Sequence, residues 1–409
     1  MTSKRLLLLA ATSGYQTQVF ADAAHALGLN IVMATDRCHI LADPWGDQAV
    51  PVRFEEPEDA AVELSRLVPP PGAIVAIGDR PTYIAALGAQ LLGLPYHPPD
   101  AVAACRNKFM ARERFRVAGL RVPRFVRLPV EGGANPIEYP CVLKPLGLSG
   151  SRGVIRANDE SEFQSAFRRI CAILQSSEIV RMRDGQDRFI QVEEFIEGRE
   201  FALEGVVTAG RLQTLAIFDK PDPLNGPYFE ETLYITPSRE PDQQQLIDST
   251  QRAITALGLT HGPIHAEMRL NADGVWMLEV AARPIGGLCA RALRFAGGSM
   301  SLEELILRHA LGEDVSGFER ESAASGVMMI PIPSNGIYRG VKGVSEAAAI
   351  ADVVITAKEG QRLQSLPEGN SYLGFLFSRG PSWEEVEQAL RLAHGQLQFE
   401  IAQQLEVVG

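Results

Sequence analysis

The sequence lacks the cysteine patterns that build disulfide scaffolds or zinc sites. Its five cysteines, at positions 38, 105, 141, 171 and 289, form no CxxC pair and no Cys/His cluster. Scattered thiols are typical of proteins in a reducing compartment, because disulfides form and persist mainly in oxidising ones. We therefore predict a cytoplasmic protein that is not stabilised by disulfides.

Long apolar runs and an excess of basic residues are also missing. The run LLLLAA after Lys4 and Arg5 is much shorter than the ~20 apolar residues of a membrane span, so we interpret it as a buried first strand. Lys plus Arg number 39 against 50 Asp plus Glu, which gives a net charge of -11. We predict no nucleic-acid or membrane partner, because both usually bind a basic surface.

The 409 residues, 46% of them hydrophobic, suffice for two or three domains. Residues 1–97 alternate short apolar runs with helical patterns, which is typical of a parallel sheet covered by helices on both faces. Residues 98–310 contain a helix at 107–118 and then mainly strands and hairpins, which indicates an antiparallel α+β region. Residues 311–409 carry many glycines and an amphipathic helix at 383–394. The predicted fold class is therefore α/β combined with α+β.

Two glutamates, Glu267 and Glu279, stand twelve residues apart in the segment GPIHAEMRLNADGVWMLEVAARPIGG. Residues 272–274 read as a three-residue hairpin loop with Gly274 in the left-handed region. In that register Asn271 faces Val275 and the two glutamates face each other. We therefore predict that the two carboxylates share one face of a hairpin.

The alternation of side chains along strands assigns the other hairpin residues. The glutamate face also carries His265, Arg269 and Met277, and the opposite face carries the predicted core residues Ala266, Met268, Leu270, Trp276, Leu278 and Val280. Paired carboxylates repel each other, so such a pair usually has a cation, a shared proton or a basic neighbour. Mg²⁺ is the predicted cation, because it binds few protein oxygens and completes its shell with water and phosphate. A solvated surface ribbon is the alternative.

The segment CVLKPLGLSGSRGVIR combines a lysine at a strand end with a loop of small residues. Ser149, Gly150, Ser151 and Gly153 would let backbone amides close around phosphate oxygens, and Lys144 would supply a positive charge. In a Walker loop the lysine follows the glycines and a helix comes next, whereas here the lysine precedes them and strands flank them. A plain hairpin turn is the alternative.

Two further segments place charged residues beside predicted strands. Glu193 and Glu194 end an apolar strand and Glu200 begins another, an arrangement that can offer backbone groups to adenine and a carboxylate to ribose. Charge on an exposed edge strand is the alternative. Asp79 and Arg80 follow a strand of the N-terminal sheet, where ligands of open sheets bind. Asp79 could instead cap the next helix.

These features, taken in order, resemble the ATP-grasp family of carboxylate-amine ligases, and L-amino acid ligases in particular. The order is NKFMARERFRVAGLRVP, VLKPLGLSGSRGV, VEEFIEGREF, HAEMRL and LEVAARPIGG, which spans about residues 107 to 290. The resemblance implies an ATP-grasp architecture with an N-terminal parallel-sheet domain at 1–97, a central nucleotide-binding domain at 98–310 and a C-terminal mixed α/β domain at 311–409. A lid subdomain is implied at about 141–195.

The resemblance also implies an activity and residue roles. Such ligases transfer the γ-phosphoryl group of ATP to a carboxylate, and an amine then attacks the acyl phosphate. ATP and Mg²⁺, or Mn²⁺ in its place, are the implied cofactors, small carboxylates and amines the implied partners, and a homodimer is compatible with the family. The resemblance implies that Lys108 and Lys144 bind the ATP phosphates under a lid of Ser149, Gly150, Ser151 and Gly153. Adenine would be held by Glu193, Glu194, Phe195 and Ile196, and ribose by Glu200. The metal ions would be bound by Glu267 and Glu279.

Arg283 and His265 are the predicted catalytic residues. A guanidinium at Arg283 could bind the transferring phosphoryl group and the tetrahedral oxyanion, or form a structural ion pair. His265 could orient the substrate carboxylate, accept an amine proton or be a structural histidine. Many ATP-grasp enzymes have Asn where this chain has Ala281, so a second metal ion would lack one oxygen ligand. Candidates for substrate selection are Lys220, Glu230 and Glu231.

Three alternative functions stay open at this point. A ligase of the purine-biosynthesis type and a biotin-carboxylase-like enzyme share the implied domain layout, although biotin carboxylases normally have a lid richer in glycine. A nucleotide-binding scaffold without turnover is the third alternative, and Ala281 is its only support.

Overall fold

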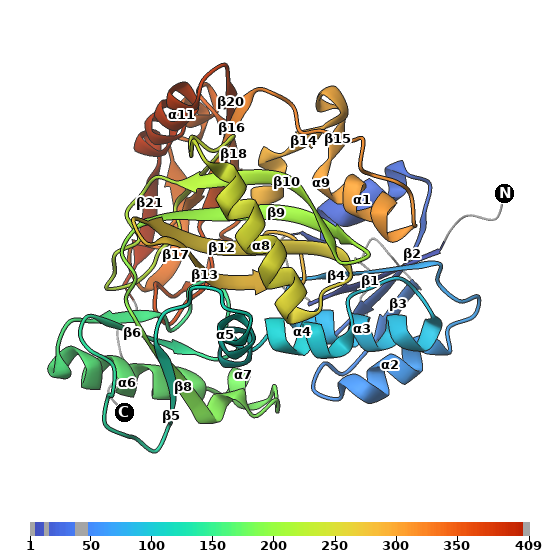
Figure 1. Ribbon diagram of the computed structural model, residues 1–409. Helices are drawn as coiled ribbons and strands as arrows, with labels where there is room; N and C mark the ends of the chain where they lie inside the picture. Colours follow the sequence, from blue (N-terminus) through green and yellow to red (C-terminus); the bar gives the residue numbers. More distant parts are fainter. Residues whose placement is uncertain (1–4, 12–15, 37–47, 404–409) are drawn as a thin grey trace.

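The computed structural model describes residues 5–11, 16–36 and 48–403. Lys4 and Cys38, named above, lie outside this part of the chain. The N-terminal sheet, the lid and the C-terminal region surround one large central sheet (Figure 1). No helix within the described residues is long and apolar enough to cross a membrane.

The N-terminal region forms the predicted parallel sheet, in the order β3-β2-β1-β4. Strands β1 and β4 are almost wholly buried because helices cover both faces of the sheet. Helices α2 and α3 pack on one face, and α1 packs on the other together with α9 of a later segment. The elements are β1 (Arg5–Ala10), α1 (Thr17–Ala26), β2 (Asn30–Thr35), β3 (Ala49–Pro51), α2 (Pro57–Ser65), β4 (Ala73–Ile77) and α3 (Asp79–Leu92).

The central sheet has eight antiparallel strands in the order β13-β12-β9-β10-β11-β16-β20-β18. Helices α4, α5 and α8 cover one of its faces through a common apolar core, and α8 lies across the strands in Figure 1. The strands are β9 (Arg199–Thr208), β10 (Arg211–Lys220), β11 (Leu233–Thr236), β12 (His261–Asn271), β13 (Gly274–Ala281), β16 (Ala324–Ile330), β18 (Asp352–Ile355) and β20 (Gly374–Gly380), and the helices are α4 (Pro99–Cys105), α5 (Lys108–Val117) and α8 (Gln243–Leu257).

The lid is a four-stranded antiparallel sheet, β5-β8-β6-β7, with helix α6 packed against it. The sequence analysis expected strands here and missed α6. Its N-cap, Asp159, accepts a hydrogen bond from the backbone N–H of Glu162 at 2.9 Å, and this D-x-x-E pattern was a readable helix start. The elements are β5 (Phe125–Pro129), β6 (Cys141–Pro145), β7 (Ile155–Ala157), α6 (Glu160–Leu174), α7 (Ser177–Val180) and β8 (Phe189–Glu194).

The C-terminal region contributes β16, β18 and β20 to the central sheet and forms a smaller sheet, β19-β17-β21. The helix predicted at 383–394 is present as α11 and extends to Gln396. The remaining elements are β14 (Arg294–Phe295), β15 (Met300–Ser301), α9 (Leu302–Ala310), β17 (Gly336–Lys342), α10 (Val344–Ala348), β19 (Arg362–Leu363), α11 (Trp383–Gln396) and β21 (Gln398–Ala402).

A loop of the C-terminal region contacts the lid. The backbone N–H of Gly153 donates to the Pro367 carbonyl at 2.8 Å, and Arg152 Nε donates to the Glu368 carbonyl at 2.8 Å. Arg169 of α6 forms an ion pair with the Glu368 carboxylate. We refer to these contacts of Gly153, Arg152 and Arg169 as the lid latch.

Candidate active site

The structure pairs Glu267 with Glu279, as predicted, but through a different hairpin. Asn271 pairs with Gly274, so the loop has two residues and the predicted three-residue loop was wrong. A bulge beyond Glu267 places one extra residue, Leu278, on β13 and restores the Glu267–Glu279 pairing. The two differences compensate, and the two glutamates face each other.

The bulge corrects the predicted faces of β13. Met277 is fully buried in the core with the β12 residues predicted there, whereas the sequence analysis placed it beside the glutamates. Leu278 lines the cavity instead of the core. The indole N–H of Trp276 donates to the Asn271 side chain at 3.0 Å, and Trp276 is only partly buried. The predicted faces were therefore wrong for these three residues, because a bulge shifts the alternation by one residue.

A cavity of about 380 Å³ lies between the lid, the central sheet and the N-terminal domain. The predicted site residues that line it are Lys108, Lys144, Ser149, Gly150, Ser151, Glu193, Glu194, Phe195, Ile196, Glu200, His265, Glu267, Glu279 and Arg283. Gly153 is not among the lining residues. A Cβ atom at Gly153 would lie 2.7 Å from the Pro145 side chain, and its φ of +73° also favours glycine.

One side of the cavity is formed by a buried cluster that we call the basic cluster: Lys144, Arg112, Glu193 and Gln191. The Glu193 carboxylate pairs with Lys144, lies 3.2 Å from Arg112 Nε, and accepts a hydrogen bond from Gln191 at 2.7 Å. Burial tends to raise the pKa of Glu193, but Arg112 and Lys144 outweigh it and lower that pKa to about 2. Burial lowers the pKa of Lys144, and Glu193 opposes that effect. Arg112 and Gln191 were not predicted from the sequence.

Lys108 lies at the start of α5, between the lid and the glutamate pair. Its ammonium donates to the Leu148 carbonyl of the lid loop at 2.6 Å and lies 3.4 Å from Glu279 Oε2. The cap of α5 explains this position, because the Asn107 side chain accepts the Met110 N–H at 3.0 Å and fixes the first turn. Lys108 therefore bridges the lid loop and Glu279.

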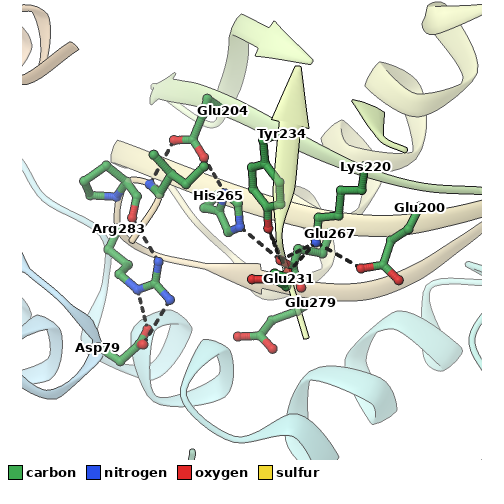
Figure 2. Close-up of polar contacts among 12 residues, drawn as sticks. Asp79, Glu200, Glu204, Lys220, Glu231, Tyr234, His265, Glu267, Glu279 and Arg283 are labelled. Carbon is green, nitrogen blue, oxygen red and sulfur yellow. Dashed lines mark hydrogen bonds and ion pairs between the residues drawn. The ribbon is translucent and has the colours of Figure 1, made fainter. Parts of the chain in front are cut away.

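The other side of the cavity holds three carboxylates around one ammonium (Figure 2). Lys220 Nζ, at the end of β10, lies 2.9 Å from Glu200, 2.6 Å from Glu231 and 2.9 Å from Glu267. We call Glu200, Glu231 and Glu267 the carboxylate cage. Tyr234 donates its hydroxyl to Glu231 at 2.7 Å, and its ring lies 4.8 Å from the ammonium.

The carboxylate cage has more negative than positive charge, and this imbalance affects the pKa values of Glu231, Glu267 and Lys220. Burial and the neighbouring Glu267 raise the pKa of Glu231 to about 7, although Lys220 opposes the shift. Burial acts in the same direction on Glu267, but Lys220 and His265 outweigh it and hold its pKa well below the usual range. The pKa of Lys220 is raised well above its usual value, since the carboxylates outweigh burial. Of Glu231 and Glu267, Glu231 is therefore the first to take up a proton.

His265 lies between Glu204 and Glu267. Its Nδ1 contacts the buried Glu204 carboxylate, and its Nε2 lies 3.3 Å from Glu267. Burial lowers the pKa of His265, but Glu204 and Glu267 outweigh it and raise the pKa to about 9. The ring thus carries a proton at neutral pH, which favours a charged, orienting role over proton acceptance. The sequence analysis missed Glu204, although it stands four residues after Glu200 and so shares its strand face.

Arg283 forms a bidentate ion pair with Asp79, with distances of 2.7 Å and 3.0 Å (Figure 2). The pair links the central sheet to the first turn of α3. Gly78 is the N-cap of that helix, so the alternative that Asp79 caps it was wrong. Arg80 pairs instead with Asp36 at 3.3 Å. An ion pair was the alternative role for Arg283, and the structure contains one inside the cavity.

The segment expected to face adenine is anchored through its backbone. The Phe195 N–H donates to the Pro140 carbonyl at 3.2 Å, and the Ile196 carbonyl accepts from Arg269 Nη1 at 2.6 Å. Arg269 also donates to Glu200 at 2.9 Å. Glu194 points toward Arg124, whose Nε lies 3.4 Å from it. Alternation along β12 had placed Arg269 on the glutamate face, but nothing in the sequence indicated its partners.

The donor atoms fit a hard divalent cation, because Mg²⁺ and Mn²⁺ prefer carboxylate oxygens. Within the described residues, the carboxylates with oxygens all within 4.8 Å of one another are Glu200, Glu231 and Glu267, and Glu279 is not part of that group. Ala281 pairs with His265 and is buried, so it supplies no side-chain oxygen.

Comparisons with known proteins bear on the domains and the fold. The family model described as an ATP-grasp domain matches residues 137–292, and the one described as L-amino acid ligase C-terminal domain 2 matches residues 328–402. Residues 137–292 therefore match an ATP-grasp domain. The crystal structure of L-amino acid ligase from Bacillus licheniformis superposes on this chain with a TM-score of 0.83 and 26% identity, over 98% of this chain and 100% of that one.

Two other relatives are more distant. Dapdiamide A synthase of Enterobacter agglomerans is 26% identical over 45% of this chain and 44% of its own length. Phosphoribosylglycinamide synthetase from Anaerococcus prevotii has a TM-score of 0.70 at 17% identity, over 98% of this chain and 100% of that one, which shows a common fold alone. The chain spans 64%, 53% and 44% of the lengths of the first curated relatives that it matches. The predicted fold class is confirmed.

Proposed function

We propose that this protein is an ATP-dependent ligase that converts a small-molecule carboxylate to an acyl phosphate and couples it to an amine, forming an amide or dipeptide bond. The observation that carries the proposal is the charge pattern of one cavity. Lys108 contacts the lid loop and Lys144 pairs with Glu193. Glu267 and Glu279 face each other on the central sheet, and Arg283 pairs with Asp79 of the N-terminal domain. Phosphoryl transfer depends mainly on positioning and charge neutralisation, which these groups could provide.

The lid side is suited to the nucleotide. The ammonium groups of Lys108 and Lys144 would neutralise phosphate oxygens, and the backbone of Ser149 to Gly153 would close over them. The segment from Glu193 to Ile196 would hold adenine. Glu193 would act mainly by fixing Lys144, since its carboxylate already binds that lysine and Arg112. Glu200 would hold ribose.

The glutamate side is suited to a metal ion. Glu267 and Glu279 would hold Mg²⁺, or Mn²⁺ in its place, and the ion would neutralise charge on the phosphates. A second ion would need a water or a bidentate Glu279, because Ala281 has no oxygen to offer.

Arg283 and His265 would act on the reacting groups. The Arg283 guanidinium, held by Asp79, would stabilise the transferring phosphoryl group and the tetrahedral oxyanion. Protonated His265 would orient the substrate carboxylate. Attack of the amine on the acyl carbon forms the C–N bond and breaks the C–O bond to phosphate. Amide, ADP and phosphate are the products.

The test is to incubate the protein with ATP, Mg²⁺ and pooled amino acids and to measure ADP, phosphate and amide products. Amide formation that matches ADP release is the expected result. Phosphate release that depends on bicarbonate or a ribosylamine would support a purine-type or carboxylase reaction. Absence of turnover across a broad panel of carboxylates and amines would support the scaffold alternative.

A further inference from the structure

Lys220 is enclosed by the carboxylate cage, and only 2% of its side chain is exposed. An ammonium has three N–H donors, and Lys220 has three carboxylate partners at 2.6 to 2.9 Å. In Figure 2 the lysine reaches the cage from β10, while Glu200, Glu267 and Glu231 reach it from β9, β12 and the segment before β11. Four segments of the chain thus meet at one ammonium.

The oxygen atoms of the cage would also suit a divalent cation. Three carboxylates whose oxygens lie within 4.8 Å of one another form a hard-oxygen site of high negative charge. The ammonium of Lys220 takes the position of such a cation, so that binding of a free metal ion requires the lysine to leave. Tyr234 limits that movement, because its ring lies 4.8 Å from Nζ and its hydroxyl binds Glu231.

We propose that Lys220 is a tethered counter-ion that closes the carboxylate cage to free divalent cations and keeps Glu267 in position for the metal ion that arrives with the nucleotide. This inference rests on the proposed function in taking Glu267 as a metal ligand and Glu200 as the ribose ligand. A free ion in the cage would bind Glu267 and Glu200. It would lie away from Glu279, which does not belong to the carboxylate cage. Lys220 is therefore a positioning residue for the metal and for ribose.

The experiment measures Mn²⁺ binding to the nucleotide-free protein through the EPR signal of free Mn²⁺. Lys220→Met is expected to create a site at least about tenfold tighter than any site of the unmodified protein, because the one cation shared by all three carboxylates is lost, while Arg269 and His265 each neutralise only one of them. Lys220→Arg keeps the charge and is expected to show no gain. Unchanged Mn²⁺ affinity in Lys220→Met, or equally tight binding by the unmodified protein, would overturn the proposal.

Lys144→Met is the matched control. It removes a buried lysine from the same cavity, but Arg112 still neutralises the single carboxylate of Glu193. No new Mn²⁺ site is expected, and a gain equal to that of Lys220→Met would mean that loss of any cavity lysine attracts metal. Circular dichroism and thermal unfolding verify the fold of each variant.

A double variant provides a second test if Lys220→Met does not fold. Lys220→Met/Glu200→Gln has less unbalanced charge and keeps Glu231 and Glu267, so a smaller gain in Mn²⁺ affinity is expected, together with a rise in melting temperature on adding Mn²⁺. Absence of both in a folded double variant would overturn the proposal. Because no ATP is present, tight Mn²⁺ binding by Lys220→Met without ligase activity in the unmodified protein would count against the proposed ligase reaction and not against the counter-ion.

Discussion

Two buried lysines, Lys144 and Lys220, differ in the charge that surrounds them. Lys144 shares one carboxylate, Glu193, with Arg112, so the basic cluster has more cations than anions. Lys220 is shared by three carboxylates. When their further partners Arg269, His265 and Glu204 are included, four carboxylates surround three cations, so this site has more anions than cations. A ligand tends to supply the charge that its site lacks. The first cluster is thus complementary to phosphate and the second to a cation.

The same difference separates two glutamates of identical chemistry. Glu193 is buried and Glu231 is largely buried, and burial alone raises the pKa of a carboxyl group. Glu193, between two cations, has a pKa of about 2, whereas Glu231, beside other carboxylates, has a pKa of about 7. The ratio of cations to carboxylates, more than burial, decides which of them is ionised at neutral pH.

The largest expected effect comes from Glu279, which lies between the two clusters through its contact with Lys108. Glu279→Gln should lower ADP release at least about 100-fold, because the proposed metal ion loses an anionic ligand. Glu138→Gln, at an exposed glutamate of the lid, is the control and should leave turnover unchanged. Unchanged turnover in Glu279→Gln would mean that the metal assignment is wrong.

Removal of the anion from the basic cluster should strongly reduce stability. Glu193→Gln leaves Lys144 and Arg112 buried without a counter-charge, and we expect a loss of about 3 kcal/mol in the free energy of unfolding. Urea denaturation measures it. The exposed Arg124–Glu138 pair, at 3.2 Å, is the comparison, and Glu138→Gln should cause no measurable change. Similar losses in both variants would contradict the importance of burial in the basic cluster.

The two glutamates should differ in how pH affects stability. The folded-state pKa of Glu231, about 7, lies above the ordinary 4.5, so its contribution is present below pH 4.5 and is lost as pH rises through 7. Glu231→Gln removes this loss, and its stability relative to the unmodified protein should rise between pH 5 and pH 8. Glu193, with a pKa of about 2, stays ionised throughout that range, so the relative stability of Glu193→Gln should stay constant. A constant difference for Glu231→Gln would contradict the charge imbalance of the cage.

The smallest effect on stability is expected at the lid latch, which holds the basic cluster's side of the cavity closed. Arg169 and Glu368 are 39% and 29% exposed, so Glu368→Ala should cost less than about 1 kcal/mol. Looser closure would admit water to the acyl phosphate, and we expect more ADP per amide formed. Arg169→Ala also loses the contact with Tyr228, so it should cost at least as much, and Glu368→Ala should add nothing to it in the double variant. Additive effects would show that the two residues act independently.

The alternation of side chains and the order of the motifs predicted which sheets are parallel and which are antiparallel. They also predicted that the charged residues lie in one cavity. The predicted pairing of Glu267 with Glu279 is present, but only because the error in loop length and the missing bulge cancel each other. The bulge at Leu278 could not be predicted, because it depends on how β13 packs between β12 and the helices. Met277 and Trp276 were misplaced for that reason.

The ion-pair partners within each cluster could not be predicted from the sequence. Lys220 and Glu231 had been grouped as candidates for substrate selection, but the cage depends on four segments meeting in space. Arg112 was not singled out in the sequence, yet it is 1% exposed. Long-range ion pairs leave no periodic signal, since their spacing along the chain follows from the fold.

The central sheet continues from β11 into β16, with Leu233 paired with Met328. The C-terminal region is therefore not a separate unit that can be exchanged without affecting the central sheet. A chimaera that takes this region from a relative has to reproduce the edge that β11 pairs with, or β11 is left with unpaired backbone groups. Glu231 stands just before β11, so strand mismatches introduced there would displace a cage carboxylate, and recombination far from the cavity would alter its metal and substrate preferences.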